Sequence, residues 1–202
     1  FGVFSPLRGE YLDLIAQAPL APHIQTAFDI GTGSGVIAAI LAKRGIPDII
    51  ATDTNPKAIA CATANLKRLG LDKAVNIQSI DLFPESCADL IVCNPPWLPA
   101  KPTSAIETAL YDPNHAMLTA FLNGVRHHLN PNGEAWLIIS DLAEHLHLRD
   151  KDFLNQCFQT ASLNVVDILK TKPQHKKAID ESDPLAFARN KETTYLYRLK
   201  AI

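Results

Sequence analysis

Apolar residues along this chain follow two patterns that alternate from one end to the other. Short apolar stretches of about four to eight residues, bounded by turn-forming residues, are typical of buried strands. Longer stretches with apolar residues three and four positions apart are typical of helices that pack on a core. The predicted strands are Thr26–Ile30, Asp48–Thr52, Val75–Ser79, Ala88–Cys93, Glu134–Ser140, Asn164–Thr171 and Thr193–Leu199. The predicted helices are Tyr11–Ala18, Val36–Leu41, Pro56–Leu69, Leu118–Leu129 and Lys151–Ala161.

Strands that alternate with helices of about 10–15 residues indicate right-handed crossovers and a mainly parallel sheet. The last two strands are joined by the polar stretch Lys172–Glu192, which shows no clear helical pattern, so we expect a hairpin-like, antiparallel ending. The predicted fold class is α/β: a doubly wound, seven-stranded, mostly parallel sheet with an antiparallel last strand and helices on both faces. We expect a single domain over residues 1–202, with a helical segment at 1–22 packing on it. The start at Phe1, without an initiator Met, leaves open a further region upstream.

Composition and charge exclude several classes of protein. The 202 residues carry 19 Lys and Arg against 21 Asp and Glu, which excludes a broadly basic nucleic-acid-binding surface but permits a local patch. No apolar run approaches the roughly 20 residues that a membrane-spanning helix needs, so no membrane partner is expected. The cysteines include no Cys-x-x-Cys pair, which favours a reducing, cytoplasmic setting. The histidines lack a recognisable ligand spacing, so no metal is expected.

The strongest local motif lies between the first predicted strand and the helix after it. It spans Asp29–Gly35 and reads Asp-Ile-Gly-Thr-Gly-Ser-Gly. Glycines at this position let the backbone turn tightly and let a ligand approach the peptide groups closely. Val36 stands where the dinucleotide fingerprint places its third glycine, which disfavours a nicotinamide oxidoreductase. A purely structural glycine-rich turn is the alternative.

Two further acidic residues stand at the ends of predicted strands. Asp53 follows the second strand, where a carboxylate can accept hydrogen bonds from both ribose hydroxyls of a nucleoside. Alternatively Asp53 caps the next helix, although Asn55 is better placed for capping. Asp81 follows the third strand and could accept from an adenine amine while Leu82 or Phe83 covers the ring; the alternative is an ordinary loop carboxylate. The glycine turn, Asp53 and Asp81 follow the first, second and third predicted strands in that order. Together they indicate a nucleoside site more specifically than any one of the three does alone.

A proline-rich corner, Asn94-Pro95-Pro96-Trp97, follows the fourth predicted strand directly. Pro96 makes Pro95 extended, and neither proline has an N–H, so their carbonyls project as acceptors. Asn94 adds a side-chain oxygen, and Trp97 adds a flat apolar face. Two acceptors and a ring suit a planar group that carries an NH2. A rigid strand exit with a packed Trp is the alternative.

This ordered set of motifs resembles the Rossmann-like (class I) S-adenosylmethionine-dependent methyltransferases, over about Pro6 to Leu199. The resemblance implies a seven-stranded sheet with an antiparallel last strand and S-adenosyl-L-methionine as the cofactor. It also implies that the glycine turn holds the methionine part, the residue matching Asp53 the ribose and the residue matching Asp81 the adenine. The cofactor-binding residues implied in this way are Asp29, Gly31, Thr32, Gly33, Gly35, Asp53, Asp81, Leu82 and Asn94.

The corner resembles the (Asn/Asp/Ser)-Pro-Pro-aromatic motif of enzymes that methylate planar nitrogens, which are glutamine amides or exocyclic amines of adenine and guanine. The resemblance implies catalytic roles for Asn94, Pro95, Pro96 and Trp97. Because the lone pair of such a nitrogen is delocalised, we expect the Asn94 side chain and the Pro95 carbonyl to accept hydrogen bonds from its N–H groups and hold it in line with the sulfonium methyl. Positioning then carries most of the catalysis, and no strong base is required.

The identity of the methyl acceptor is less well specified. The corner most resembles that of the release-factor glutamine methyltransferases, and Leu110–Pro113 with His115–Leu118 is similar to their acidic-Pro segment before the next helix. Trp97 replaces their usual Tyr, and their N-terminal substrate-docking domain is absent unless it lies upstream of Phe1. Phe4–Pro6 also resembles small-domain RNA methyltransferases.

We therefore expect an N-methyltransferase that acts on a protein glutamine, with a translation factor as one such partner, slightly ahead of an RNA or DNA nucleobase. A late cluster of cations, Lys170–Lys177, is followed at once by the acidic stretch Asp180–Asp183, which favours a solvated loop over a phosphate track. A non-catalytic module that binds the cofactor or RNA is the remaining alternative, and the intact Asn94–Trp97 corner argues against it.

Overall fold

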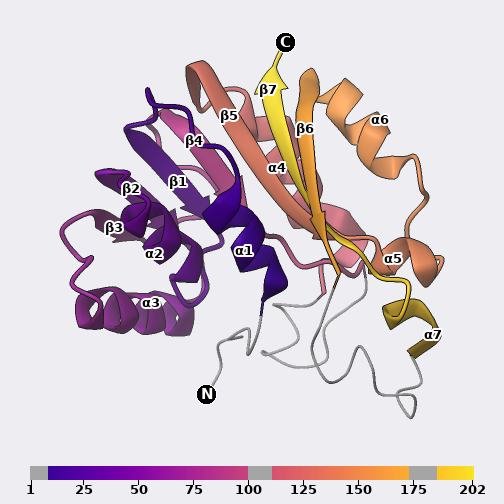
Figure 1. Cartoon of the computed structure of the whole chain (residues 1–202), viewed down its shortest axis with the longest axis horizontal. Coiled ribbons are helices and arrows are strands. Elements are labelled where there is room, and N and C mark those ends of the chain that lie inside the picture. The colour runs from indigo at the N-terminus through magenta and orange to yellow at the C-terminus, as the bar shows by residue number, and fades with distance from the viewer. Residues whose placement is uncertain (1–8, 100–110, 173–185) are drawn as a thin grey trace.

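The computed structural model describes residues 9–99, 111–172 and 186–202 of the chain. These residues form a seven-stranded sheet in the order β3-β2-β1-β4-β5-β7-β6 (Figure 1). The strands are β1 (Thr26–Ile30), β2 (Asp48–Thr52), β3 (Val75–Gln78), β4 (Ala88–Cys93), β5 (Leu129–Ser140), β6 (Leu163–Thr171) and β7 (Thr194–Ala201). Neighbours from β3 to β5 pair in parallel, whereas β7 runs antiparallel to both β5 and β6. The predicted fold class, including its antiparallel ending, is confirmed.

Helices cover both faces of the sheet (Figure 1). They are α1 (Glu10–Gln17), α2 (Val36–Lys43), α3 (Pro56–Arg68), α4 (Ala116–Val125), α5 (Leu142–His145), α6 (Phe153–Thr160) and α7 (Ala186–Arg189), with a 3-10 turn η2 (Pro113–His115) before α4. Side chains alternate along each strand, so Ala27 joins the core beneath α1 and α2, and its neighbour Phe28 joins the core beneath α4 and α6. Within the described ranges, none of the helices combines the length and apolar character required to cross a membrane.

The ends of α3 follow directly from its local sequence. Asn55 precedes the helix, and its side-chain oxygen accepts from the backbone N–H of Lys57 at 2.9 Å. Pro56 occupies the first turn, where its missing N–H costs no helical hydrogen bond. Gly70 ends the helix with a φ of +69°, a conformation that suits glycine. The predicted cap, start and end of this helix are confirmed.

The second half of the chain differs in detail from the prediction. β5 begins at Leu129 rather than Glu134, because Ala88 pairs with Leu129 while Leu90 pairs with Glu134, and the residues between bulge out of the ladder. Pro131–Gly133, which were predicted to form a turn before the strand, therefore lie in a bulge within β5. α4 ends at Val125, before the end of the apolar stripe. The four-residue helices α5 and α7 were not predicted, because they are too short to show a helical period.

Helix α1 is anchored on the face of the sheet that also carries α2. Its buried side consists of Tyr11, Leu14 and Ile15, and it contacts α2, β6 and β7. The Arg44 guanidinium, just after α2, donates to the backbone carbonyls of Ile15 and Ala18 at the end of α1. These bonds satisfy carbonyls that have no partner within the helix and hold α1 in place. Residues 1–8 of the predicted N-terminal segment lie outside the described residues.

Asp89, near the amino end of β4, ties that strand to the start of β1. One carboxylate oxygen accepts from the backbone N–H groups of Gln25 and Thr26, both at 2.9 Å, and from the Thr26 hydroxyl at 3.0 Å. The other accepts from the Asn130 amide at 2.9 Å. Burial acts to raise the pKa of Asp89, but these hydrogen bonds together lower it to about 2.

We expect Asp89→Asn to lower the free energy of unfolding at pH 7 by about 1–2 kcal/mol, because a neutral amide accepts these hydrogen bonds more weakly. Since folding depresses the pKa of Asp89, its contribution is present above about pH 4 and is lost as the pH falls toward 2. Urea unfolding of both chains at several pH values measures the difference. A difference that stays the same between pH 7 and pH 3 would contradict this assignment.

Candidate active site

The carboxyl ends of β1 and β4 bring the two strongest sequence motifs side by side. The two strands are parallel neighbours, and Ile30 pairs with Cys93 at their ends. The next residue after Ile30 is Gly31, which opens the glycine turn, and the next after Cys93 is Asn94, which opens the corner. Ligands of open α/β sheets bind outside the carboxyl ends of the strands. The strand register therefore sets the turn and the corner together at the edge where a ligand is expected.

All three glycines of the turn adopt backbone conformations that residues with a Cβ rarely adopt. Gly31, Gly33 and Gly35 have φ angles of +70°, +55° and +80°. A Cβ on Gly31 would lie 2.7 Å from the Met117 methyl carbon, and a Cβ on Gly35 would lie 3.1 Å from the Ala62 side chain. A Cβ on Gly33 would meet no atom within 4 Å. The outer glycines therefore allow close packing, whereas Gly33 leaves the backbone accessible.

Asp29 is a buried carboxylate beneath this turn. One of its oxygens accepts from the Thr32 hydroxyl at 2.6 Å and from the backbone N–H of Ala38, in the first turn of α2, at 3.0 Å. The other oxygen is buried and has no hydrogen-bond partner. Burial raises the pKa of Asp29 to about 6, although both hydrogen bonds act to lower it. The site thus contains an acceptor whose partner is not supplied by the described protein.

The Asp53 carboxylate joins the glycine turn to the start of α3. One oxygen accepts from the backbone N–H of Gly33 and the other from the backbone N–H of Asn55, at 2.9 and 2.8 Å. Asn55 caps α3, as predicted, and Asp53 holds the middle of the turn instead. Each carboxylate oxygen has more than one lone pair, so Asp53 keeps capacity to accept from a ligand.

The loop after β3 is tied to the end of β2. Leu82 has a φ of +53°, and its carbonyl accepts from the Thr52 hydroxyl at 2.7 Å. Phe83 stacks on His128, with ring centroids 4.5 Å apart and planes at 7°. Leu82 and Phe83, the two residues expected to cover a bound ring, are both half-buried and pack against the core beneath α4 and α6. Asp81 is exposed just before it.

Asn94 and Trp97 are hydrogen-bonded to each other across the corner. The Trp97 indole N–H donates to the Asn94 side-chain oxygen at 3.0 Å. Pro95 is buried, and Trp97 is half-buried against both cores of the protein. The sequence predicted a free Asn94 acceptor and a flat Trp97 face. The structure adds that the indole N–H already uses one lone pair of the Asn94 oxygen.

Tyr11 of α1 completes the corner, and the sequence analysis did not find it. Its ring meets the Trp97 ring edge to face, with centroids 6.1 Å apart and planes at 80°. Burial, together with the negative charge of Asp29, raises the pKa of Tyr11 to about 12, and a side-chain hydrogen bond with Asn94 acts to lower it. The sequence signal for Tyr11 was its place in the apolar stripe of its helix. That place indicates that Tyr11 is buried but does not indicate that it contacts Trp97.

The chain that leaves the corner returns to the glycine turn at the start of α4. The backbone N–H of Asp112 donates to the Leu98 carbonyl at 2.8 Å. The Asp112 carboxylate accepts from the backbone N–H groups of Met117 and Leu118 at 2.9 and 3.0 Å. A carboxylate at this end of a helix is favourable, because the N–H groups there lack helical partners. Asp112 thus holds Met117 beside Gly31.

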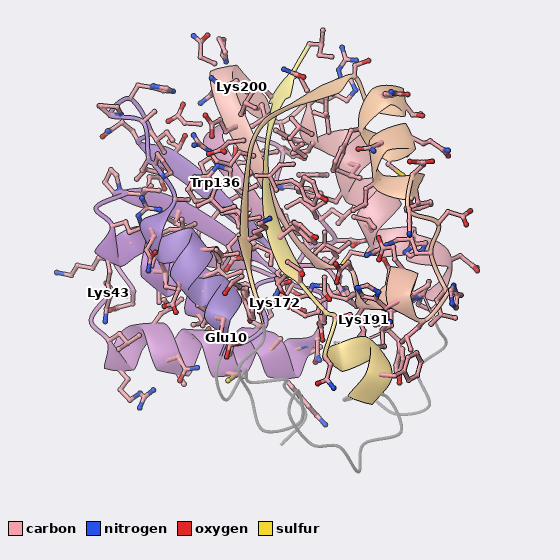
Figure 2. The ribbon with its side chains drawn as sticks, turned by 45° about the vertical axis from the view of Figure 1, so that its right-hand side comes forward. Glu10, Lys43, Trp136, Lys172, Lys191 and Lys200 are labelled. Atoms are coloured by element: carbon pink, nitrogen blue, oxygen red, sulfur yellow. The ribbon has the colours of Figure 1, made fainter. Side chains whose placement is uncertain are left out.

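The charged residues of the late sequence cluster lie partly at the same edge and partly outside the described residues. Lys172 of that cluster, just after β6, lies toward the edge where the parallel strands end, as do Glu10 of α1 and Lys191, just before β7 (Figure 2). Other segments that the sequence singled out lie outside the described ranges. They are residues 173–177 of the cation cluster, the acidic stretch Asp180–Asp183, Leu110 and Phe4–Pro6. In the part that is described, no three His, Cys, Asp or Glu side chains gather in a way that could hold a metal ion.

A family model described as "Methyltransferase small domain" matches residues 12–168. The chain belongs to the methyltransferase small domain family. Its seven-stranded sheet with an antiparallel β7 agrees with the class I methyltransferase fold that the motifs predicted. S-adenosylmethionine is the methyl donor of that class, so membership of the family implies it as the cofactor.

Curated relatives include both protein and RNA methyltransferases. The chain is 35% identical over 140 residues to a release factor glutamine methyltransferase of Cereibacter sphaeroides, covering 62% of this chain and 50% of the relative. It is 31% identical over 133 residues to a tRNA1(Val) (adenine(37)-N6)-methyltransferase of Cytophaga hutchinsonii, covering 62% of this chain and 56% of that relative. The chain thus spans about half the length of these relatives.

Solved methyltransferase structures share the fold. A ribosomal protein L11 methylase of Lactobacillus delbrueckii subsp. bulgaricus superposes with a TM-score of 0.65 and 19% identity, covering 98% of this chain and 81% of its own. A SAM-dependent methyltransferase of Thiobacillus denitrificans, in complex with S-adenosyl-L-homocysteine, gives a TM-score of 0.64 and 16% identity, covering 98% and 93%. At these identities the likeness concerns the fold alone.

Two observations test whether the edge fits such a cofactor. The unpartnered, buried oxygen of Asp29 is an acceptor for a donor that the described protein does not provide. Gly33 presents backbone with open space before it, and Asp53 stands next to it. An ammonium or hydroxyl donor and a nucleoside are groups that these positions can bind, so the residues fit S-adenosylmethionine.

We expect Asp29→Asn to stabilise the protein at neutral pH. Folding raises the pKa of Asp29 from 3.8 to about 6, so its contribution is fully present below about pH 4 and is lost as the pH rises through 6. Asparagine is neutral throughout and keeps an oxygen for Thr32 and Ala38. The gain above pH 6 is at most about 3 kcal/mol, since one pKa unit corresponds to about 1.4 kcal/mol.

Urea unfolding of the two chains at pH 4, 5, 6 and 8 tests this expectation. The stability difference should be near zero at pH 4 and grow in favour of the asparagine variant up to about pH 6. Taking the difference at each pH removes the titration of the other carboxylates. A variant that is less stable at pH 8 would show that the charged Asp29 stabilises the fold.

Proposed function

We propose that this chain is an S-adenosylmethionine-dependent N-methyltransferase that acts on a planar nitrogen, most directly the side-chain amide of a protein glutamine. The observation that carries the proposal is the pairing of Ile30 with Cys93, which sets the Asn94 corner beside the glycine turn. A methyl donor held on the turn and an acceptor held on the corner would be adjacent. We further propose that residues 1–202 form one methyltransferase domain that works in the cytoplasm.

The proposed cofactor site follows the ends of three strands. Asp29 and the turn residues Gly31, Thr32, Gly33 and Gly35 would hold the amino-acid part, with the free oxygen of Asp29 accepting from the ammonium group. Asp53 would accept from the ribose hydroxyls, and Asp81 and Leu82 would bind the adenine. When bound, the cofactor supplies an electrophilic methyl group on a sulfonium. Asn94 borders this site because it follows β4, the neighbour of β1.

The corner would bind and orient the acceptor. The Asn94 side-chain oxygen and the Pro95 carbonyl accept hydrogen bonds from the two N–H groups of an NH2, while Pro96 keeps Pro95 extended. Trp97 holds Asn94 through the indole N–H. Fixing both protons turns the nitrogen lone pair toward the methyl donor, which is catalysis by orientation. After transfer the nitrogen is acidic and loses its proton without a dedicated base.

A protein acceptor is favoured over a nucleobase by two observations. The chain is slightly acidic, with 21 Asp and Glu against 19 Lys and Arg, whereas phosphate binding needs clustered cations. Three of the relatives described as release factor glutamine methyltransferases are 33–35% identical to this chain. The tRNA adenine methyltransferase relative, at 31%, makes an exocyclic amine of RNA the second candidate.

We expect Gly33→Ala to weaken binding of S-adenosylmethionine by about tenfold or more, because the added methyl enters the open space where the cofactor would approach the backbone. Gly70→Ala is the matched control. Gly70 also has a positive φ and open space before it, but it lies beyond α3, away from the turn. Both variants should lose about 1–2 kcal/mol of stability from the strained φ.

Isothermal titration with S-adenosylmethionine compares the two glycine variants with the original chain. The result expected is a lower affinity for the Gly33 variant only. Equal affinities for all three chains would place the cofactor elsewhere.

Transfer of label from S-adenosylmethionine tests the reaction itself. The chain is incubated with a labelled methyl donor and either a bacterial release factor or tRNA. We expect label on a glutamine of the protein, and we expect Asn94→Ala to lower the transfer rate by about 100-fold, with a much smaller effect on cofactor affinity because Asn94 only borders the cofactor site. The exposed Asn76→Ala is the control and should retain the full rate.

The other outcomes of this assay separate the alternatives. Label on the exocyclic amine of a tRNA base would identify the nucleobase as the acceptor. Cofactor binding without any transfer to protein or RNA would indicate the non-catalytic module.

A further inference from the structure

The side chain of Asn94 belongs to a cluster with two aromatic residues from different parts of the chain. Trp97, three residues further on, donates its indole N–H to the Asn94 oxygen at 3.0 Å. Tyr11, from α1, makes an edge-to-face contact with the Trp97 ring. The three residues therefore form one contiguous cluster at the candidate active site.

A side-chain amide can turn by half a rotation and exchange its oxygen for its nitrogen. The two ends have opposite roles, because the oxygen only accepts and the NH2 only donates. The indole N–H of Trp97 is a donor only, so it selects the oxygen of Asn94. A reversed Asn94 would set its own NH2 against the indole N–H. Trp97 thus distinguishes the two orientations of the amide in a way that a purely apolar ring does not.

The ring of Tyr11 supports the Trp97 ring from the side of α1. The two rings meet edge to face, with centroids 6.1 Å apart and planes at 80°. Burial and the negative charge of Asp29 raise the pKa of the Tyr11 phenol to about 12, so the phenol stays neutral at physiological pH. Tyr11 itself is held, because Arg44 bonds the end of its helix.

We propose that Trp97 is a positioning residue that holds the Asn94 amide in one orientation, with its oxygen toward the indole N–H, and that Tyr11 positions Trp97 through the contact between their rings. One lone pair of the oxygen then remains for one N–H of the methyl acceptor. This inference rests on the proposed function in one respect only, which is that the remaining lone pair binds the methyl acceptor. Trp97 acts through its N–H in addition to its ring, and α1 is part of the active site.

Nuclear magnetic resonance of the nitrogen-15-labelled chain tests the orientation without any activity. The sequence has two tryptophans, so two indole N–H signals are expected. Asn94→Ala should move the Trp97 signal and speed its exchange with solvent by about tenfold, the loss that one hydrogen bond implies. The Trp136 indole donates to Glu134 at 3.0 Å and serves as the internal reference.

The Trp97 indole signal also tests the contribution of Tyr11. Tyr11→Leu should shift it, because the aromatic ring that meets Trp97 edge to face is removed. Tyr197→Leu is the matched control, since burial also raises the pKa of Tyr197 to about 12, but Tyr197 packs against the core on the other face of the sheet. That variant should leave the Trp97 signal unchanged. A Trp97 signal that responds to neither Asn94→Ala nor Tyr11→Leu would overturn the proposal.

Transfer kinetics then separate positioning from a structural role. Trp97→Phe keeps an aromatic ring but removes the N–H. We expect its kcat to fall about tenfold, with the affinity for S-adenosylmethionine within twofold of the original, because misorientation affects the transfer step and leaves the cofactor site intact. An unchanged kcat would overturn the positioning role. Absence of transfer by the unmodified chain would instead reject the proposed function, and the resonance data would still decide the orientation of Asn94.

Discussion

The buried carboxylate of Asp29 is the constraint on which the candidate site depends. It holds Thr32 and the first turn of α2, and thereby the shape of the glycine turn. After burial itself, its negative charge is the next cause of the raised pKa values of Tyr11 and of the buried Cys93 thiol. Both groups therefore stay protonated. A buried charge without a full set of hydrogen-bond partners lowers the stability of the fold. Such a loss of stability is typical of residues at binding sites.

Parallel pairing converts this local arrangement into a composite site. Because β1 and β4 end in register, two motifs more than 60 residues apart in the sequence meet without any intervening loop having to reach across the sheet. Asp112 adds a third segment, since it caps α4 and sets Met117 beside Gly31. The carboxyl edge thus gathers the ends of strands and the starts of helices, where backbone N–H groups are available to a ligand.

The fold was largely predictable because its central strands are continuous apolar runs with clear ends. Thr26–Ile30, Asp48–Thr52 and Ala88–Cys93 have the predicted bounds, and the residues after them carry the motifs. What could not be predicted involves contacts between distant segments. The helical stripe shows that Tyr11 is buried, but only the packing of α1 shows that it faces Trp97. The bulge in β5 and the inward packing of Phe83 likewise depend on neighbours that periodicity does not describe.

The chemistry proposed for the corner depends on two neighbouring groups, a thiol and a phenol, that do not act as bases at neutral pH. The Cys93 thiol directly precedes Asn94, and the Tyr11 ring contacts Trp97, yet burial raises the pKa of both groups so that neither removes a proton at neutral pH. The polar groups of Asn94–Trp97 themselves are carbonyl and amide oxygens, which accept hydrogen bonds but do not take protons, together with the indole N–H. Such a site favours an acceptor that arrives with N–H groups to donate and a lone pair to align. A planar NH2 meets both requirements, and in the function that we propose its orientation by Asn94 is the step that the surrounding aromatic residues control.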